Sequence, residues 1–93
     1  MVKVKWTPQA RNDLKAIYQY IALDSVYYAK TFKDTLQSKV KNLSTFPLMG
    51  RTVPEYNDPN VRELIHGDYR AFYEVFPNEV HILSIVHGKM KID

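Results

Sequence analysis

The sequence predicts an α+β fold: an N-terminal strand, an antiparallel two-helix hairpin, and then a mainly antiparallel C-terminal sheet. Three observations predict it. The first residues alternate apolar and charged, the next forty place apolar residues three and four apart, and the last third alternates again between turn signals. The 93 residues suit one domain, expected to span 1–93, and a 45% hydrophobic content is that of a globular chain.

The first strand and the first helix adjoin each other. Val2, Val4 and Trp6 alternate with lysines, which indicates a half-buried strand. Thr7 can cap a helix. Pro8 suits the first helical position, because the N–H that proline lacks is not needed there and its fixed φ matches that of a helix. This helix is expected from about Pro8 to Ala22, with one apolar stripe of Ala10, Leu14, Ile17, Tyr18 and Ile21.

A second helix should follow almost at once. Asp24-Ser25 breaks the first helix and caps the next, which is expected from Ser25 or Val26 to Thr45. Its apolar stripe is Ala29, Phe32, Leu36, Val40 and Leu43. Because so few residues separate the two helices, they must be antiparallel neighbours.

The remaining chain predicts a long loop and three strands. Prolines and a glycine interrupt any periodicity over residues 47–60, so this is a loop, and loops of that length are often functional. The strands are expected at 61–66, 69–76 and 80–86, joined by turns at Gly67-Asp68 and Pro77-Asn78. Such turns make these strands antiparallel. The last strand is almost wholly apolar, which predicts burial on both faces at the sheet centre.

Composition excludes several classes of function. The chain has no cysteine, so disulfides and thiolate metal sites are excluded and a reducing, cytoplasmic compartment is expected. No signal peptide and no apolar run of about 20 residues is present. The three histidines lie far apart, so we expect no metal site and no cofactor. A net charge of +3 permits an acidic partner or nucleic acid without requiring one.

Enzyme motifs such as phosphate-binding glycine loops or a nucleophilic serine elbow are absent, but one group of polar residues could carry chemistry. It comprises Arg62, Tyr69, Arg70, Tyr73 and His87 on the C-terminal strands, with Arg51 and Glu55 from the loop. Arginine matches phosphate or carboxylate, histidine transfers protons near neutral pH, and tyrosine stacks on bases. The group could therefore cleave RNA or recognise a protein.

Structural roles compete with these functional ones. Arg70 could pair with Glu63 or Glu74, and Arg62 could be an ordinary surface residue. Arg51 could hold the long loop through backbone carbonyls.

The two tyrosines and the histidine have structural alternatives as well. Tyr69 and Tyr73 share a strand face with Ala71 and Val75, which favours core packing for at least one of them. His87 could simply end its strand.

Over nearly its whole length the chain resembles the RelE/ParE superfamily of bacterial toxins. The resemblance rests on Trp6-Thr7-Pro8-Gln9-Ala10, Asp13-Leu14, Ile17, Tyr20-Ile21, Phe46-Pro47, Gly50-Arg51, Val61-Arg62-Glu63-Leu64, Tyr69-Arg70, Tyr73 and Ile82-Leu83-Ser84-Ile85-Val86-His87-Gly88. It implies a helical hairpin packed on a mainly antiparallel sheet and a growth-inhibiting toxin. It also implies an antitoxin partner that wraps an apolar groove, to which Tyr28, Phe32 and Phe46 could contribute.

Two mechanisms occur in this superfamily: RelE-like members cleave mRNA on the ribosome and ParE-like members block DNA gyrase. The nuclease branch generally has a basic residue after the late histidine and a tyrosine soon afterwards. Here Gly88 follows His87, and residues 89–93 contain no tyrosine. The resemblance therefore implies a ParE-like gyrase inhibitor. The alternatives are a nuclease using Arg70, Arg62, His87 and Glu55, or a non-toxic interaction domain.

Overall fold

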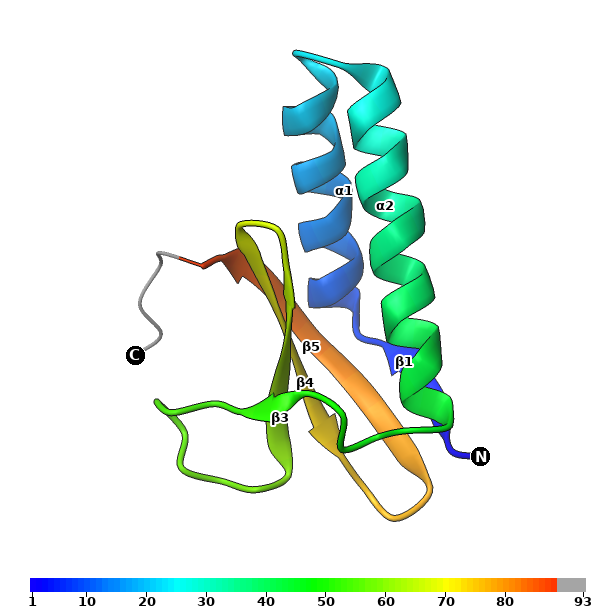
Figure 1. Cartoon of the computed structure of the whole chain (residues 1–93), viewed down its shortest axis with the longest axis vertical. Helices are drawn as coiled ribbons and strands as arrows, with labels where there is room; N and C mark the ends of the chain where they lie inside the picture. Colours follow the sequence, from blue (N-terminus) through cyan, green and yellow to red (C-terminus); the bar gives the residue numbers. More distant parts are fainter. Residues whose placement is uncertain (89–93) are drawn as a thin grey trace.

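The computed structural model describes residues 1–88. In chain order its elements are β1 (Lys3–Trp6), α1 (Pro8–Ala22), α2 (Val26–Lys41), a 3₁₀ turn (Asn42–Ser44), β2 (Arg51–Thr52), β3 (Val61–His66), β4 (Tyr69–Val75) and β5 (Glu79–His87). The strands form one five-stranded sheet in the order β1-β5-β4-β3-β2. The helices form an antiparallel hairpin whose far end projects beyond the sheet (Figure 1).

Side-chain caps set the starts of both helices, as predicted. The Ala10 N–H donates to the Thr7 hydroxyl (3.2 Å), and the Tyr28 N–H donates to the Ser25 hydroxyl (3.1 Å). The end of α2 differs from the prediction of Thr45, because the helix stops at Lys41. The Thr45 N–H donates to the Asn42 carbonyl three residues before it, which is the bond of a 3₁₀ turn, and the Phe46 N–H donates to the same carbonyl.

The order of strands corrects one prediction. β4, not β5, is the central strand: residues 70–73 of β4 are all buried, whereas Leu83 and Val86 of β5 are only partly buried. β5 pairs antiparallel with β4 on one side and parallel with β1 on the other. The parallel pair is possible because the helical hairpin forms the long connection that such a pair needs.

The predicted loop contains a short strand that periodicity could not reveal. β2 is only two residues long and pairs antiparallel with β3, with Arg51 opposite Glu63 and Thr52 opposite Arg62. Two residues are too few to show alternation, so the sequence alone indicated a loop here. The pairing holds the middle of this segment against the sheet edge.

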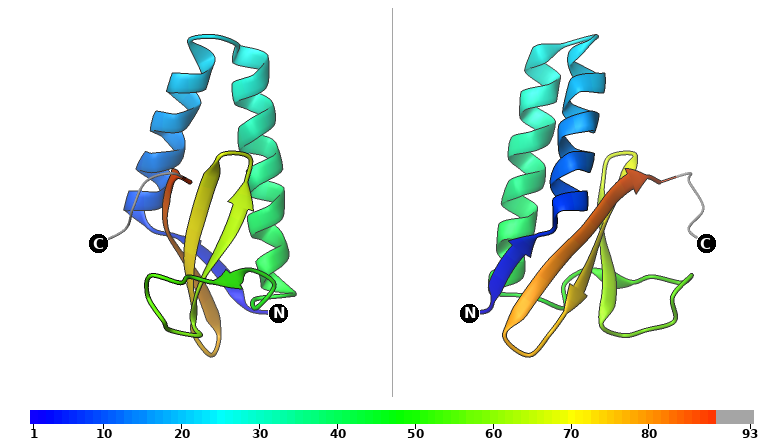
Figure 2. Two further views of the ribbon diagram at one scale, coloured as in Figure 1. Left: turned by 60° about the vertical axis from the view of Figure 1, so that its left-hand side comes forward. Right: turned by 180° about the vertical axis from the view of Figure 1, so that it is seen from behind.

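The helical hairpin covers one face of the sheet, as predicted (Figure 2). The core between the layers consists of Ala10, Leu14, Ile17, Leu36, Val40, Leu43, Leu64, Ala71, Tyr73, Val80, Ile82 and Ile85. A smaller apolar cluster of Val53, Val61 and Phe72 lies on the other face, which we call the open face. Within residues 1–88, neither helix is long and apolar enough to cross a membrane.

Tyr73 joins this core to the long loop. Its ring has no exposed surface, and its hydroxyl accepts a hydrogen bond from the buried Gly50 N–H (2.9 Å). Burial raises the pKa of Tyr73. A Cβ on Gly50 would lie 2.6 Å from both the Tyr73 hydroxyl and the Glu63 carbonyl, so only glycine fits this contact.

We predict that Tyr73→Phe lowers the free energy of unfolding by about 1–3 kcal/mol, because it leaves the buried Gly50 N–H without an acceptor. Urea denaturation of both proteins measures the change. Tyr27→Phe, which removes the hydroxyl of a tyrosine that is 74% exposed, is the matched control and should change little. Equal effects of the two substitutions would contradict this role for Tyr73.

The tip of the β3–β4 hairpin rests on α2 through His66. The Nε2 atom of His66 lies 3.1 Å from the Thr35 hydroxyl, and its ring packs edge-on against Phe32. The Lys39 ammonium donates to the neighbouring Ile65 carbonyl (3.2 Å). Burial, followed by the charge of Lys39, lowers the pKa of His66 below 6.5.

We predict that acidification loosens this contact. Since the pKa of folded His66 lies below 6.5, its contribution is complete above that pH. Below that pH the unfolded chain binds more protons, so the contribution is lost as pH falls. The free energy of unfolding, measured from pH 8 to pH 5, should fall less steeply in His66→Gln than in the wild type. Parallel curves for the two proteins would refute the assignment.

Candidate functional site

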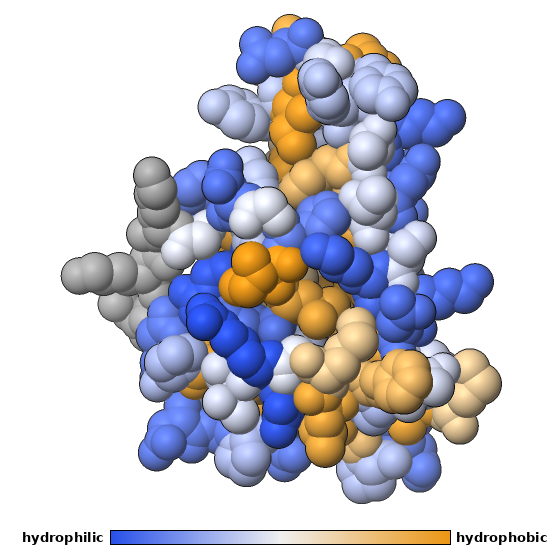
Figure 3. All heavy atoms as spheres, viewed as in Figure 1, coloured by the Kyte–Doolittle hydropathy of each residue, from blue (hydrophilic) through white to orange (hydrophobic). Residues whose placement is uncertain are grey.

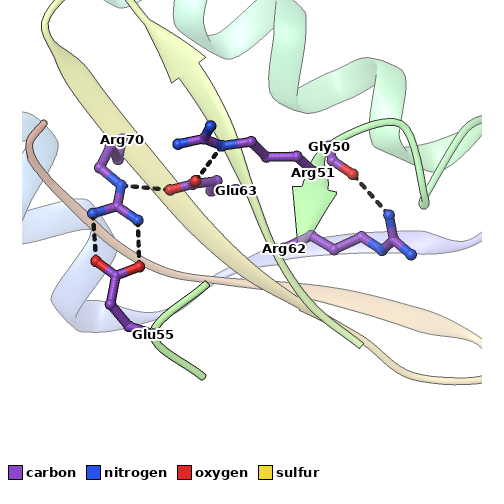
Figure 4. A network of polar contacts seen from close by, with 6 residues as sticks. All are labelled: Gly50, Arg51, Glu55, Arg62, Glu63 and Arg70. Atoms are coloured by element: carbon purple, nitrogen blue, oxygen red, sulfur yellow. Dashed lines mark hydrogen bonds and ion pairs between the residues drawn. The ribbon is translucent and has the colours of Figure 1, made fainter. Parts of the chain in front are cut away.

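Glu63 lies at the centre of a charged cluster on the open face. It sits on β3, between Arg51 on β2 and Phe72 on β4. Its side chain has no exposed surface, and it accepts hydrogen bonds from the Nε atoms of Arg51 and Arg70 (2.5 Å each). Figure 4 shows the two guanidinium groups on different sides of its carboxylate. A buried carboxylate needs such partners, because losing water is costly for a charged group.

Arg70 is shared between two carboxylates. Besides the bond to Glu63, its Nη1 and Nη2 atoms donate to the two oxygens of Glu55, each at 2.9 Å. Its guanidinium carbon also lies 4.8 Å from the centre of the Phe72 ring. Of the two partners considered from the sequence, Arg70 therefore pairs with Glu63 and not with Glu74. It pairs in addition with Glu55 from the loop.

These contacts shift the pKa values of both Glu55 and Arg70. The hydrogen bond from Arg70 is the largest of the effects that lower the pKa of Glu55 to about 2. The same bond, followed by that to Glu63, raises the pKa of Arg70. Glu55 is therefore ionised at neutral pH and is a weak general base there.

Arg62 has the role that was considered for Arg51. Arg62, rather than Arg51, holds the loop through carbonyls: it donates to Pro59 (3.0 Å), Leu48 (3.2 Å) and Gly50 (2.8 Å). Arg62 precedes Glu63 on the same strand, so its side chain leaves from the opposite face, pointing away from the charged cluster (Figure 4). Arg51 instead pairs with Glu63.

The tyrosines and the histidine divide between the core and the end of the sheet. Tyr73 is core, and Tyr69 packs edge-on against Phe32 and against His87, with ring centroids 5.2 and 5.4 Å apart. Burial raises the pKa of Tyr69. The predicted group is therefore split, since Arg62 and Tyr73 lie apart from the remaining members.

The remaining members border one open pocket of about 490 Å³. Its lining includes the predicted Arg51, Glu55, Tyr69, Arg70 and His87, together with Pro54, Ile65, Gly67, Asp68 and Gly88. Of the two arginines that line it among the described residues, Arg51 is the more accessible, because its side chain is 62% exposed whereas that of Arg70 is 9% exposed. Among residues 1–88, no three or more histidine or acidic side chains are grouped to hold a metal ion.

Glu63 is the site residue that sequence reasoning considered only as a partner. The sequence did contain a signal for it. Glu63 lies between Val61 and Ile65, which share its face of the strand, so it places a charge among apolar side chains. A charge at such a position requires a counter-charge on the adjacent strand. Only the register shows that two arginines, from different strands, supply it.

Exposed apolar side chains form the other distinctive surfaces. One set lies at the far end of the helical hairpin, and another follows the 3₁₀ turn, in the lower part of the molecule where Figure 3 shows orange side chains gathered. The members are Tyr20, Leu23, Val26, Tyr27 and Tyr28 in the first set and Phe46, Leu48 and Met49 in the second. Of the residues proposed for antitoxin binding, Tyr28 and Phe46 are exposed, whereas Phe32 packs against the core.

We predict that Glu63→Ala destabilises the fold by about 3–5 kcal/mol, because it removes the partner of the buried Arg70. Glu74→Ala, at a half-buried position on the same face of the sheet, is the control and should cost far less. Thermal and urea unfolding measure both. A small effect at Glu63 would show that the cluster is not held by its charge.

Comparison with known proteins agrees with this architecture. Residues 4–92 match the model of the ParE toxin of the type II toxin–antitoxin system parDE. The chain is 31% identical to a chain of the chromosomal ParDE toxin–antitoxin system from P. aeruginosa, with a TM-score of 0.76 over 94% of this chain and 96% of that one.

A more distant structural match is a chain of the RelBE2 toxin–antitoxin complex from Mycobacterium tuberculosis. It is 24% identical, with a TM-score of 0.58 over 92% of this chain and 96% of that one, and shows the shared fold. No curated protein sequence matches. The family match spans β1 to the C-terminal region and includes every residue of the charged cluster, so the chain belongs to the ParE toxin family of type II toxin–antitoxin systems.

Proposed function

We propose that this toxin arrests growth by binding DNA gyrase and that a cognate antitoxin neutralises it. The family match over residues 4–92 supports the toxin role, and the similarity to the P. aeruginosa ParDE system supports an antitoxin partner. The exposed apolar sets at the hairpin end and the 3₁₀ turn are surfaces of the kind that protein partners cover.

One observation favours binding over RNA cleavage: the guanidinium of Arg70 is already occupied by Glu55 and Glu63. A nuclease needs arginines that are available to a developing phosphorane charge. Arg62 is also engaged, by three carbonyls of the long loop. Binding RNA depends strongly on cations that meet phosphate, and this cluster offers few.

The alternative is a ribosome-dependent mRNA endoribonuclease. It is favoured by the pocket that brings the exposed Arg51 beside Tyr69 and His87. In that case Arg70 would have to leave Glu55 before it could contact phosphate. A non-toxic interaction domain is the third candidate.

We predict that the purified toxin inhibits gyrase supercoiling at modest molar excess and leaves mRNA intact on translating ribosomes. Adding the antitoxin should restore supercoiling, and inducing the toxin alone should stop growth. Unaffected supercoiling together with site-specific mRNA cuts that Arg70→Ala abolishes would establish the nuclease instead. Normal growth without antitoxin would favour the interaction domain.

A further inference from the structure

Arg70 holds two carboxylates that differ in how firmly the fold fixes them. Glu63 is part of β3, which is paired on both sides, and its side chain has no exposed surface. Glu55 comes from the segment between β2 and β3, and a third of its side chain is exposed (33%). The two contacts are drawn side by side in Figure 4.

We propose that Glu55 occupies, as an internal ligand, a preformed carboxylate site whose donors are the Nη atoms of Arg70 and which Arg51 borders, and that an acidic side chain of a partner protein takes its place when residues 54–57 move aside.

The site is preformed because Glu63 orients both arginines without help from Glu55. It accepts from the Nε atoms of Arg70 and Arg51, so these two hydrogen bonds do not use the Nη atoms of either arginine. The guanidinium of Arg70 is further held against the Phe72 ring. The two Nη atoms of Arg70 bind the oxygens of Glu55 in parallel, an arrangement that suits any carboxylate of similar position.

Glu55 is replaceable because the segment that carries it is anchored mainly at its two ends. Val53 anchors the segment by burial, and its carbonyl accepts from the N–H groups of Tyr56 and Asn57. At the far end the Pro59 carbonyl accepts from the Arg62 Nε (3.0 Å). Between the ends Glu55 binds Arg70, and the Tyr56 ring lies 6.4 Å from the Phe72 ring. Exchange for another carboxylate also avoids the main cost of opening the site, since Arg70 never lacks a counter-charge.

The surroundings fit a protein side chain better than nucleic acid. With Glu55 withdrawn, Arg51, Arg70 and Glu63 together carry one net positive charge, which one carboxylate balances. Asp68 on the pocket wall opposes a polyanion. Ile65, which is 47% exposed and borders the same pocket, offers a contact for an apolar neighbour of the acidic residue.

The test uses small carboxylates to fill the space that the Glu55→Ala substitution opens. Sodium acetate should raise the melting temperature of this variant in a saturable way, by roughly 4 °C relative to sodium chloride of equal ionic strength. Wild type and Asp34→Ala, which removes an exposed acidic residue on α2, should show no such rise. Glu55→Ser opens the same space and gives an independent measurement.

A second comparison uses the capped peptides Glu-Leu-Glu and Gln-Leu-Gln. Only the acidic peptide should stabilise Glu55→Ala, and it should shift the Arg70 Nε–H signal in the nuclear magnetic resonance spectrum. No response to acetate or to the acidic peptide would overturn the proposal. Tighter binding of inorganic phosphate or of a short oligoribonucleotide than of the acidic peptide would overturn the assignment to a protein carboxylate. Neither measurement involves gyrase or growth, so the carboxylate-site proposal can fail while the proposed function holds, and the reverse is also possible.

Discussion

The balance of charge around the buried carboxylate of Glu63 decides how the open face is arranged. The residue lies where β2, β3 and β4 meet, with no exposed surface, so its two arginine partners cannot be optional. Arg51 ties β2 to β3, and Arg70 ties β4 to β3 and, through Glu55, to the loop. One charge thereby positions three strands and a segment with no periodicity of its own.

Arg62, which precedes Glu63, holds the long loop on the other face of the sheet. Arg62 and Glu63 are consecutive on a strand, so their side chains leave from opposite faces. Arg62 donates to the carbonyls of Leu48, Gly50 and Pro59, near both ends of the long loop. The Tyr73 hydroxyl accepts from the Gly50 N–H on the same face. The loop is ordered because the sheet holds it from both sides.

Local features of the sequence were sufficient to predict most of the fold. Thr7 and Ser25 mark the helix starts because their hydroxyls accept backbone N–H groups within the same turn. The antiparallel strands β3, β4 and β5 followed from alternation and short turns. Such signals need only the few residues around them, which is why they are visible without a structure.

The errors concern contacts between distant segments. The parallel pairing of β1 with β5, and hence the central place of β4, joins residues more than seventy positions apart. Alternation places Arg70 and Phe72 on one face of β4 but says nothing of what lies opposite them on β3. For the same reason, the sequence suggested one group containing Arg62 and Tyr73, whereas the register divides it.

The same register explains why Arg70 in this chain is poorly placed for phosphate chemistry. An arginine that stabilises a phosphorane must be free to exchange partners, whereas the Arg70–Glu63 contact balances a charge inside the sheet. Breaking it would leave Glu63 buried with Arg51 alone. The fold can release Arg70 from Glu55, which is partly exposed, but not from Glu63 without disturbing β3. Within residues 1–88, one side of the Arg70 fork, the exposed Arg51 and the apolar side chains that the core leaves uncovered are accessible, and these are kinds of group that protein-binding surfaces use.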